Sequence, residues 1–375
     1  MKKNFINSTA LAAMLLAAAC SGDAKKTAAD STGADTAAIV ADTAAELKPA
    51  GPAPAWAPSM KPEMQVVIEK LASYGDKPIP QLTAVEARKN HTPTDAVMDV
   101  MKEHGIAKPA FKVDTMGKDI PVNGGDIHVR VYTPQTGKSS YPVIVYYHGG
   151  GFVIANLDVY DASPNALAQM TDAVVVSVAY RLAPENKFPV AHNDAFDAYK
   201  WVVANASSIK GDPKKIAVAG ESAGGNLAVA TAIKARDSKV MLPTAILAVY
   251  PVAQSDMNTA SYVKNAAAKP LDKPMMAWFV KNYLNSMAEA KDPRISLVSA
   301  NLKGLPATTI ITAEIDPLQS DGMMLADKLK AAGVTVDSKN WDGVTHEFFG
   351  MGAVVPQAKE AEQYAADQLK KAFGM

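Results

Sequence analysis

Short runs of strand-forming residues recur along the chain, and longer stretches of helical pattern separate them. The predicted strands cover residues 143–147, 173–178, 216–219, 245–250, 308–313 and 334–340. The last predicted helix covers residues 357–372. Because strands alternate with helices, the pattern predicts a mostly parallel sheet covered by helices on both faces.

Two further runs precede these strands, and they alternate between apolar and polar positions. They cover residues 120–122 and 127–132, and the Asn123-Gly124 pair between them is typical of an antiparallel hairpin. The hairpin and the six later strands together predict an eight-stranded sheet.

The segment Gly220-Glu221-Ser222-Ala223-Gly224 lies between the strand at 216–219 and a helical stretch at 226–234. A serine between two such glycines, at a turn from strand to helix, is typical of a nucleophile elbow. The glycines are needed because a side chain at either position would collide with the neighbouring strand or helix. We therefore predict that Ser222 is a catalytic nucleophile.

The strand at 143–147 ends in His148-Gly149-Gly150-Gly151-Phe152. Three glycines allow the main chain to approach a ligand closely, with N–H groups that can stabilise a tetrahedral oxyanion. The alternative is a flexible glycine turn after a strand. Because the elbow occurs in the same chain, we favour the interpretation as an oxyanion hole. Its donors would be the N–H groups of Gly149, Gly150 and Ala223.

Four motifs carry a resemblance to a known family. Two of them are the glycine run after the strand at 143–147 and the nucleophile elbow. Between these two lie Tyr180-Arg181-Leu182-Ala183-Pro184-Glu185 and the segment with Phe188-Pro189, Ala191, Asp194 and Ala195. From about residue 60 onward the chain resembles the bacterial hormone-sensitive-lipase-like branch of the α/β-hydrolases. The resemblance implies an α/β-hydrolase fold with a helical cap, and a serine hydrolase that uses no metal or organic cofactor. Glu221 stands where the family often has Asp or Thr.

A serine nucleophile needs a base, which is usually a histidine oriented by a carboxylate. The chain order in α/β-hydrolases is Ser, acid, His, and only His346 of the six histidines follows Ser222. We therefore predict that His346 is the base. A zinc-protease motif at His346-Glu347 is excluded because Gly350 occupies the place of the second histidine. Structural roles are predicted for the histidines at 91, 104, 128 and 192.

The acid is expected after the strand at 308–313. The family motif there begins Asp-Pro-Leu and ends in glycine, which matches Asp316-Pro317-Leu318 and Gly322. The resemblance therefore assigns the acid to Asp316, with Glu314 and Asp321 as competitors. Gln319 and Ser320 replace the family's Arg-Asp pair, which predicts a weaker local ion pair around this loop.

The predicted cap consists of two segments, residues 60–110 and 254–295. The first has a helical pattern that is interrupted by Pro78 and Pro80. The second contains a group of large apolar residues, namely Met275, Met276, Trp278, Phe279 and Tyr283. This group would line an acyl pocket if the segment covers Ser222. The alternative is that its members only pack the helix against the domain.

The composition excludes several classes of function. The chain has 38 basic and 38 acidic side chains, so it offers no excess charge for nucleic acid or an acidic surface. It contains no dinucleotide-binding fingerprint and no phosphate-binding loop. Hydrophobic residues make up 48%, which is ample for one sizeable core.

The N-terminal 20 residues have the pattern of a targeting segment. Lys2 and Lys3 precede an apolar run at residues 10–19, and Cys20 is the only cysteine of the chain. The sequence resembles a bacterial lipoprotein signal peptide with Cys20 as the acylated first mature residue. The alternative is an ordinary secretory leader. Residues 21–58 are rich in Ala, Thr, Asp and Pro and predict a flexible tether of ~35 Å before a catalytic domain at 59–375.

These features predict an exported, lipid-anchored carboxylesterase that acts on short- to medium-chain acyl esters. The only contact with a membrane would be through the lipid at Cys20. The anchored protein would lie at the outer membrane or face the periplasm. One alternative retains the triad but removes acetyl groups from carbohydrate or cleaves amides or peptides. A second alternative is a non-catalytic ligand-binding protein. The sequence specifies neither the oligomeric state nor the natural substrate.

Overall fold

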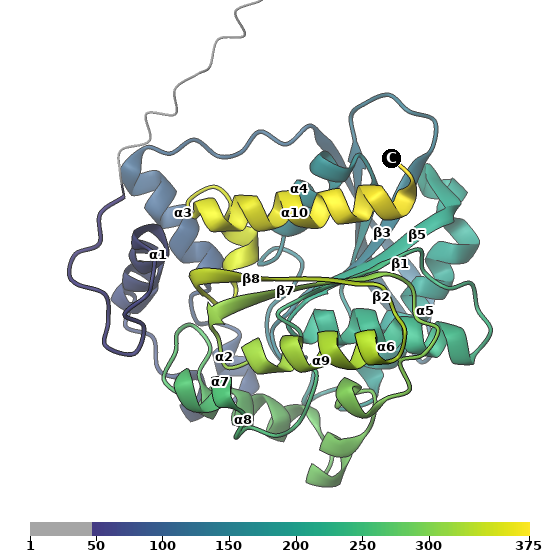
Figure 1. The fold of residues 1–375 in the computed structure, drawn as a ribbon. Coiled ribbons are helices and arrows are strands. Elements are labelled where there is room, and N and C mark those ends of the chain that lie inside the picture. The colour runs from purple at the N-terminus through teal and green to yellow at the C-terminus, as the bar shows by residue number, and fades with distance from the viewer. Residues whose placement is uncertain (1–46) are drawn as a thin grey trace, which may run out of the picture. The chain divides into compact units, whose positions relative to one another are not determined.

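The computed structural model describes residues 47–375, so the predicted leader, Cys20 and most of the predicted tether lie outside the described residues. An eight-stranded sheet in the order β1-β2-β4-β3-β5-β6-β7-β8 forms the centre of the fold (Figure 1). Its strands are β1 (Val113–Val122), β2 (Gly125–Pro134), β3 (Tyr141–Tyr147), β4 (Val174–Val178), β5 (Gly211–Glu221), β6 (Ile246–Val249), β7 (Thr308–Ile315) and β8 (Val336–Thr345). The eight predicted strands are confirmed.

The two strands of the hairpin account for the antiparallel part of the sheet. β1 and β2 pair antiparallel from Val113↔Pro134 to Val122↔Gly125, with Asn123 and Gly124 as the turn. β2 also pairs antiparallel with β4, and the remaining neighbours are parallel. The prediction of a mostly parallel sheet is therefore confirmed.

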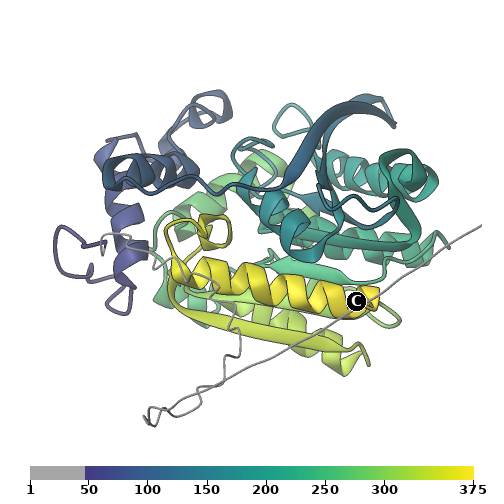
Figure 2. The same cartoon turned by 90° about the horizontal axis from the view of Figure 1, so that it is seen from above.

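Helices cover both faces of the sheet, as predicted. The α-helices are α1 (Pro62–Ser73), α2 (Ala84–Ala87), α3 (Pro93–His104), α4 (Ala162–Thr171), α5 (Val190–Asn205), α6 (Ala223–Asp237), α7 (Ala260–Lys264), α8 (Lys273–Tyr283), α9 (Gln319–Ala331) and α10 (Pro356–Phe373). Short 3₁₀ turns are η1 (Ile79–Gln81), η2 (Ala206–Ile209), η3 (Met287–Lys291), η4 (Leu297–Ser299) and η5 (Phe348–Met351). Figures 1 and 2 show α4 and α10 on one face of the sheet and α5, α6 and α9 on the other.

Each face of the sheet has its own hydrophobic core. In β3, Val143, Val145 and Tyr147 belong to the core shared with α5, α6 and α9. Ile144 and Tyr146 point the other way, into the core shared with α4 and α10. Since successive side chains of a strand alternate between faces, a strand that is apolar at every position is buried on both sides.

The two predicted cap segments contact each other over one end of the sheet. Trp278 on α8 donates a hydrogen bond from Nε1 to the carbonyl oxygen of Leu82, at 2.9 Å. Two helices of the first segment, α2 and α3, begin at side-chain caps. Thr83 and Thr92 each accept a hydrogen bond from the backbone N–H three residues later and form capping boxes with Glu86 and Asp95.

The predicted tether boundary at Pro58 is wrong, because the chain contacts the domain from Leu47 onward. Leu47 and Ala57 are buried in the core next to α1. The Gln65 amide on α1 donates to the carbonyl oxygens of residues 51 and 52 at 2.9 and 3.1 Å. This segment has no regular apolar period, and it is held by side chains of α1 that satisfy its backbone groups.

The shared family motif after β4 connects three parts of the fold. Asp194 on α5 is fully buried and accepts hydrogen bonds from Arg181 Nε at 2.9 Å and Nη2 at 2.6 Å. The same guanidinium donates to the carbonyl oxygen of Asn123 in the hairpin turn, at 2.8 Å. The pair therefore ties the hairpin and the loop after β4 to α5.

We predict that Asp194→Ala lowers the free energy of unfolding by about 3–5 kcal/mol, because it leaves a partly buried guanidinium without its carboxylate. Urea unfolding followed by circular dichroism would measure this change. Asp367→Ala on α10 is the matched control, since Asp367 is exposed, and it should change stability by less than about 0.5 kcal/mol. Equal stability of the Asp194 variant and the wild type would contradict the structural role.

Candidate active site

Ser222 lies in the tight turn between β5 and α6, as the elbow pattern predicts. Its backbone has φ 55° and ψ −117°, which a non-glycine residue rarely adopts. The turn is held by hydrogen bonds, since Ser222 N–H donates to the Val249 carbonyl at 2.8 Å and Val252 N–H donates to the Ser222 carbonyl at 3.2 Å. The strain is therefore supported by neighbouring backbone groups.

The two glycines of the elbow are enforced by contacts with backbone. A β-carbon at Gly220 would lie 2.2 Å from the carbonyl oxygen of Gly224. A β-carbon at Gly224 would lie 1.9 Å from the carbonyl oxygen of Tyr147 at the end of β3. The collision with the neighbouring strand and helix is thus as predicted from the sequence.

We predict that Gly224→Ala destabilises the fold by more than about 3 kcal/mol and lowers activity, because α6 must move away from β3. Thermal unfolding and a standard ester assay would measure both effects. Gly51→Ala is the control, because a β-carbon there has nothing within 4 Å. A Gly224 variant as stable and active as this control would refute the steric argument.

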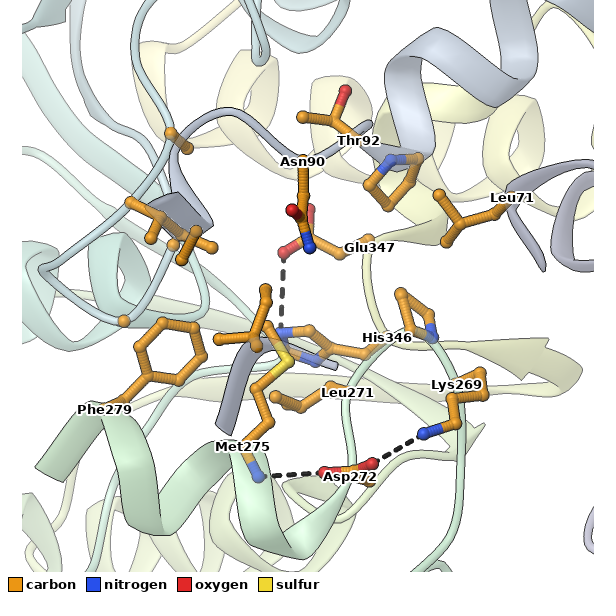
Figure 3. Close-up of a pocket in the computed structure, with 18 of the residues that line it drawn as sticks. Leu71, Asn90, Thr92, Lys269, Leu271, Asp272, Met275, Phe279, His346 and Glu347 are labelled. Carbon is orange, nitrogen blue, oxygen red and sulfur yellow. Dashed lines mark hydrogen bonds and ion pairs between the residues drawn. The ribbon is translucent and has the colours of Figure 1, made fainter. Parts of the chain in front are cut away.

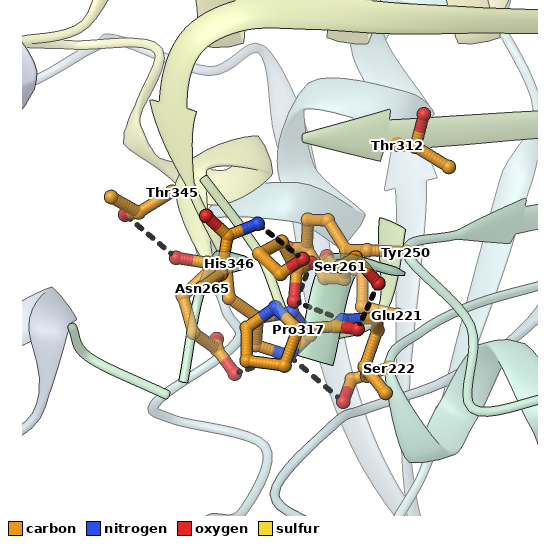
Figure 4. A network of polar contacts seen from close by, with 12 residues as sticks. Glu221, Ser222, Tyr250, Ser261, Asn265, Thr312, Pro317, Thr345 and His346 are labelled. Atoms are coloured by element: carbon orange, nitrogen blue, oxygen red, sulfur yellow. Dashed lines mark hydrogen bonds and ion pairs between the residues drawn. The ribbon is translucent and has the colours of Figure 1, made fainter. Parts of the chain in front are cut away.

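Ser222, His346 and Asp316 lie in one hydrogen-bonded chain at the carboxyl ends of β5, β7 and β8. His346 Nε2 is 3.0 Å from Ser222 Oγ, and His346 Nδ1 is 2.7 Å from Asp316 Oδ2 (Figure 4). Asp316 is fully buried, and its other oxygen accepts a hydrogen bond from Leu318 N–H at 2.8 Å. The structure thus brings together the three side chains predicted as nucleophile, base and acid.

The competing carboxylates are bound elsewhere. Glu314 accepts hydrogen bonds from Ser59 Oγ and from Gly343 N–H, both at 2.9 Å. Asp321 is buried and accepts hydrogen bonds from the backbone of Ala253 and from Gln254. Burial raises the pKa of Asp321 to about 7 against these hydrogen bonds. Asp316 is therefore the carboxylate that orients His346.

Gln319 and Ser320, which replace the Arg-Asp pair of the family motif, take part in neutral hydrogen bonds. The Gln319 amide donates to Asn340 Oδ1 at 3.0 Å, and Ser320 N–H donates to Ser261 Oγ at 3.0 Å. The loop that carries Asp316 is therefore attached to β8 and α7 without a charge pair at these positions.

The pKa of His346 lies above its ordinary value of 6.5. Burial lowers this pKa. The negative charge and hydrogen bond of Asp316, together with the charges of Glu347 and Glu221, raise it by more than burial lowers it. The protonated imidazole is thus stabilised inside the site, as a general base requires.

The glycine loop after β3 presents backbone N–H groups near Ser222. Gly150 and Gly151 have φ values of +94° and +59°. A β-carbon at Gly149 would lie 2.2 Å from the Tyr160 hydroxyl oxygen, and a β-carbon at Gly151 would collide with the Phe279 ring. Among the hydrogen bonds of residues 47–375, none uses the N–H of Gly149, Gly150 or Ala223 as donor. These three N–H groups are free to bind an anion.

His148 stabilises this loop from below. Its ring is buried, stacks on Tyr180 at 4.4 Å between ring centroids, and its Nδ1 lies 2.7 Å from the Gly149 carbonyl oxygen. Burial lowers the pKa of His148 to about 4 against that hydrogen bond. A neutral ring that donates to the carbonyl therefore holds the glycine loop.

Two tyrosines that sequence reasoning missed hold Glu221 behind the nucleophile. The hydroxyl groups of Tyr146 and Tyr250 donate to its two carboxylate oxygens. Burial raises the pKa of Glu221 to about 7, and these hydrogen bonds oppose the rise. The tyrosines lie at the ends of β3 and β6, the two strands that flank β5. Only this strand order indicates that they meet Glu221.

A cavity of about 450 Å³ opens above Ser222 and His346 (Figure 3). Its walls come from both cap segments, with Ile68 and Leu71 on α1 and Met275, Met276 and Phe279 on α8. The prediction of an apolar pocket is therefore confirmed for three of the five named residues of the second segment.

Trp278 and Tyr283 do not line this cavity. Trp278 points toward Leu82, as described above, and the Tyr283 hydroxyl lies 2.7 Å from His192 Nδ1. For these two residues the alternative of simple packing is correct.

The remaining histidines have contacts that fit the structural roles predicted for most of them. His192 is buried between Tyr283 and Asn226, and burial lowers its pKa to about 4. His128 lies 2.7 Å from Asp119 on the hairpin. His91 stacks on Tyr74 and also lines the cavity, which the sequence did not indicate.

The described residues contain neither a candidate metal site nor a helix that could span a membrane. Residues 47–375 contain no group of three or more His, Cys, Asp or Glu side chains arranged to hold a metal ion. In the same part of the chain, every helix is too short or too polar to cross a membrane.

Comparisons with known proteins agree with this fold. A family model described as alpha/beta hydrolase fold matches residues 144–350. The chain belongs to the α/β-hydrolase family and is a hydrolase. This confirms the family, the fold class and the enzyme class predicted from the sequence.

Several of the relatives and solved structures are named as esterases or ester hydrolases. Carboxylesterase NlhH of Mycobacterium tuberculosis is 41% identical over 252 residues, which cover 66% of this chain and 79% of the relative. Ethyl acetate hydrolase of Pseudomonas putida is 33% identical over 302 residues, covering 78% and 92% of the two chains. The crystal structure of a thermostable esterase from Pseudomonas putida ECU1011 superposes with a TM-score of 0.78 at 32% identity, covering 85% of this chain and 99% of the other.

Proposed function

We propose that this protein hydrolyses carboxylic esters of short to medium acyl length, with Ser222 as nucleophile, His346 as base and Asp316 as acid. The observation that carries the proposal is the unbroken hydrogen-bond chain from Ser222 Oγ to Asp316 at the floor of an apolar cavity. The esterase names of the relatives support the same reaction class.

In the first half of the proposed reaction, Ser222 Oγ attacks the ester carbonyl while His346 Nε2 takes its proton. Asp316 stabilises the resulting imidazolium through Nδ1. The N–H groups of Gly149, Gly150 and Ala223 stabilise the negative oxygen of the tetrahedral intermediate. His346 then gives its proton to the leaving alcohol, and an acyl-enzyme remains on Ser222.

In the second half, His346 takes a proton from water, and the resulting hydroxide attacks the acyl carbonyl. Collapse of the second tetrahedral intermediate returns the proton to Ser222 Oγ and releases the acid. These steps need only the side chains and the backbone groups described above.

The cavity supports short to medium acyl chains. Its volume of about 450 Å³ lies in the range of small-molecule sites, and methionine, leucine and phenylalanine side chains form much of its wall. Apolar walls bind hydrocarbon better than a sugar, whose hydroxyl groups would lose their hydrogen bonds to water. The cavity thus favours esters with hydrocarbon groups over acetyl esters of carbohydrate.

We predict that Ser222→Ala lowers kcat on p-nitrophenyl butyrate by at least about 10⁴-fold, because no other group can form the acyl-enzyme. Labelling with a fluorophosphonate probe, which reacts with activated serines, should be lost in parallel. Ser207→Ala, which changes an exposed serine, is the control and should behave as wild type. Unchanged turnover by purified Ser222→Ala would refute the assignment.

We also predict the acid limb of the pH profile. His346 must be neutral to accept a proton, and its pKa is raised above 6.5, so kcat/KM should fall as the pH drops through a midpoint above 6.5. Well below that midpoint the loss should be about tenfold per pH unit. A profile measured with an uncharged ester that stays flat down to about pH 5 would contradict the role of His346.

A further inference from the structure

Glu347 follows His346 directly and lines the cavity over it (Figure 3). Its backbone lies in the left-handed region, with φ 70° and ψ 4°, where glycine is favoured. A side chain held there against its backbone preference is a sign of a functional position.

The Glu347 carboxylate faces the reacting nitrogen of the imidazole. Its Oε1 lies 3.8 Å from His346 Nε2, the nitrogen that also contacts Ser222. Both carboxylate oxygens lie 2.7 Å from the Tyr160 hydroxyl, which donates to them. The side chain is 21% exposed, so the carboxylate is held in place and still reaches the cavity.

Glu347 differs from the other carboxylates that line the cavity. Asp76 lies 3.0 Å from His91, and Asp272 lies 2.6 Å from Lys269. Among the described residues, His346 is the only basic side chain within 4 Å of the Glu347 carboxylate. Since His346 is neutral when substrate binds, the negative charge of Glu347 is left uncompensated in the resting site.

The position of Glu347 relative to His346 defines which part of a substrate it meets. To be protonated, the leaving oxygen must come within about 3 Å of His346 Nε2. Because Glu347 Oε1 is 3.8 Å from the same nitrogen, a group two or three bonds beyond the leaving oxygen comes close to the carboxylate.

Resting on the proposed esterase function, we propose that Glu347 is a specificity-determining residue. It selects esters whose leaving alcohol carries a cationic nitrogen on its second carbon, as in esters of amino alcohols. It disfavours esters whose leaving alcohol carries a carboxylate at a similar distance from the leaving oxygen, because like charges repel in a partly buried site.

The test compares three butyrate esters that differ in the charge of the alcohol. Butyrylcholine is cationic, 3,3-dimethylbutyl butyrate is its uncharged isostere, and butyryloxyacetate is anionic. Burial raises the pKa of Glu347, so kcat/KM is measured at about pH 8, because a higher pH favours the ionised carboxylate.

Glu347→Gln retains an acceptor for the Tyr160 hydroxyl, and Glu347→Gly suits the left-handed backbone. In both variants the preference for butyrylcholine over its isostere should fall by about tenfold, and the discrimination against butyryloxyacetate should weaken by a similar factor. Asp237→Asn, which removes one exposed charge outside the cavity, should retain the wild-type ratios. Tyr160→Phe removes the hydroxyl that holds the carboxylate, so it should also weaken the discrimination.

Two results would overturn the proposal. One is unchanged ratios in both Glu347 variants while they still hydrolyse the uncharged isostere. The other is an equal loss of discrimination in Asp237→Asn, because the effect would then not depend on a charge in the cavity. If wild-type enzyme fails to hydrolyse the uncharged isostere and short p-nitrophenyl esters, the proposed esterase function fails, and this inference fails with it.

Discussion

The close approach of the start of α6 to the end of β3 is the constraint on which the site depends. Only a glycine fits at residue 224, since a β-carbon there would lie 1.9 Å from the Tyr147 carbonyl oxygen. This contact forces the chain to reverse within one residue and places Ser222 in a strained conformation. It also brings the N–H of Ala223 beside the glycine loop that follows β3. The same contact therefore positions both Ser222 and the groups proposed to bind the anion.

A layer of buried polar side chains supports that turn from behind. Glu221 is held by Tyr146 and Tyr250, and the neutral ring of His148 holds the glycine loop. These groups come from three adjacent strands, so their hydrogen bonds fix the strand ends relative to one another. A buried polar network that is fully satisfied favours one arrangement, because any other leaves groups without a partner.

The elements that could be predicted from the sequence are those whose cause is local or follows from chain order. The elbow needs glycines for steric reasons, and chain order leaves His346 as the base. Chain order alone left Glu314, Asp316 and Asp321 open as the acid, and the family resemblance named Asp316. Tyr146 and Tyr250 could not be predicted, because their convergence on Glu221 depends on the strand order. The tether boundary was placed too late because residues 47–58 have no apolar period, and side chains of α1 hold them in place.

His346 lies between two carboxylates whose surroundings assign them different tasks. Asp316 is fully buried and 2.7 Å from Nδ1, so its charge is poorly screened and its hydrogen bond fixes the ring. Glu347 is 3.8 Å from Nε2 and partly exposed to the cavity, so its attraction to the imidazolium is weaker and more screened. In the proposed reaction the proton moves at Nε2, on the side of the ring where a substrate would also bind. A carboxylate on that side therefore acts on whatever occupies the cavity, whereas Asp316 acts on the imidazole alone.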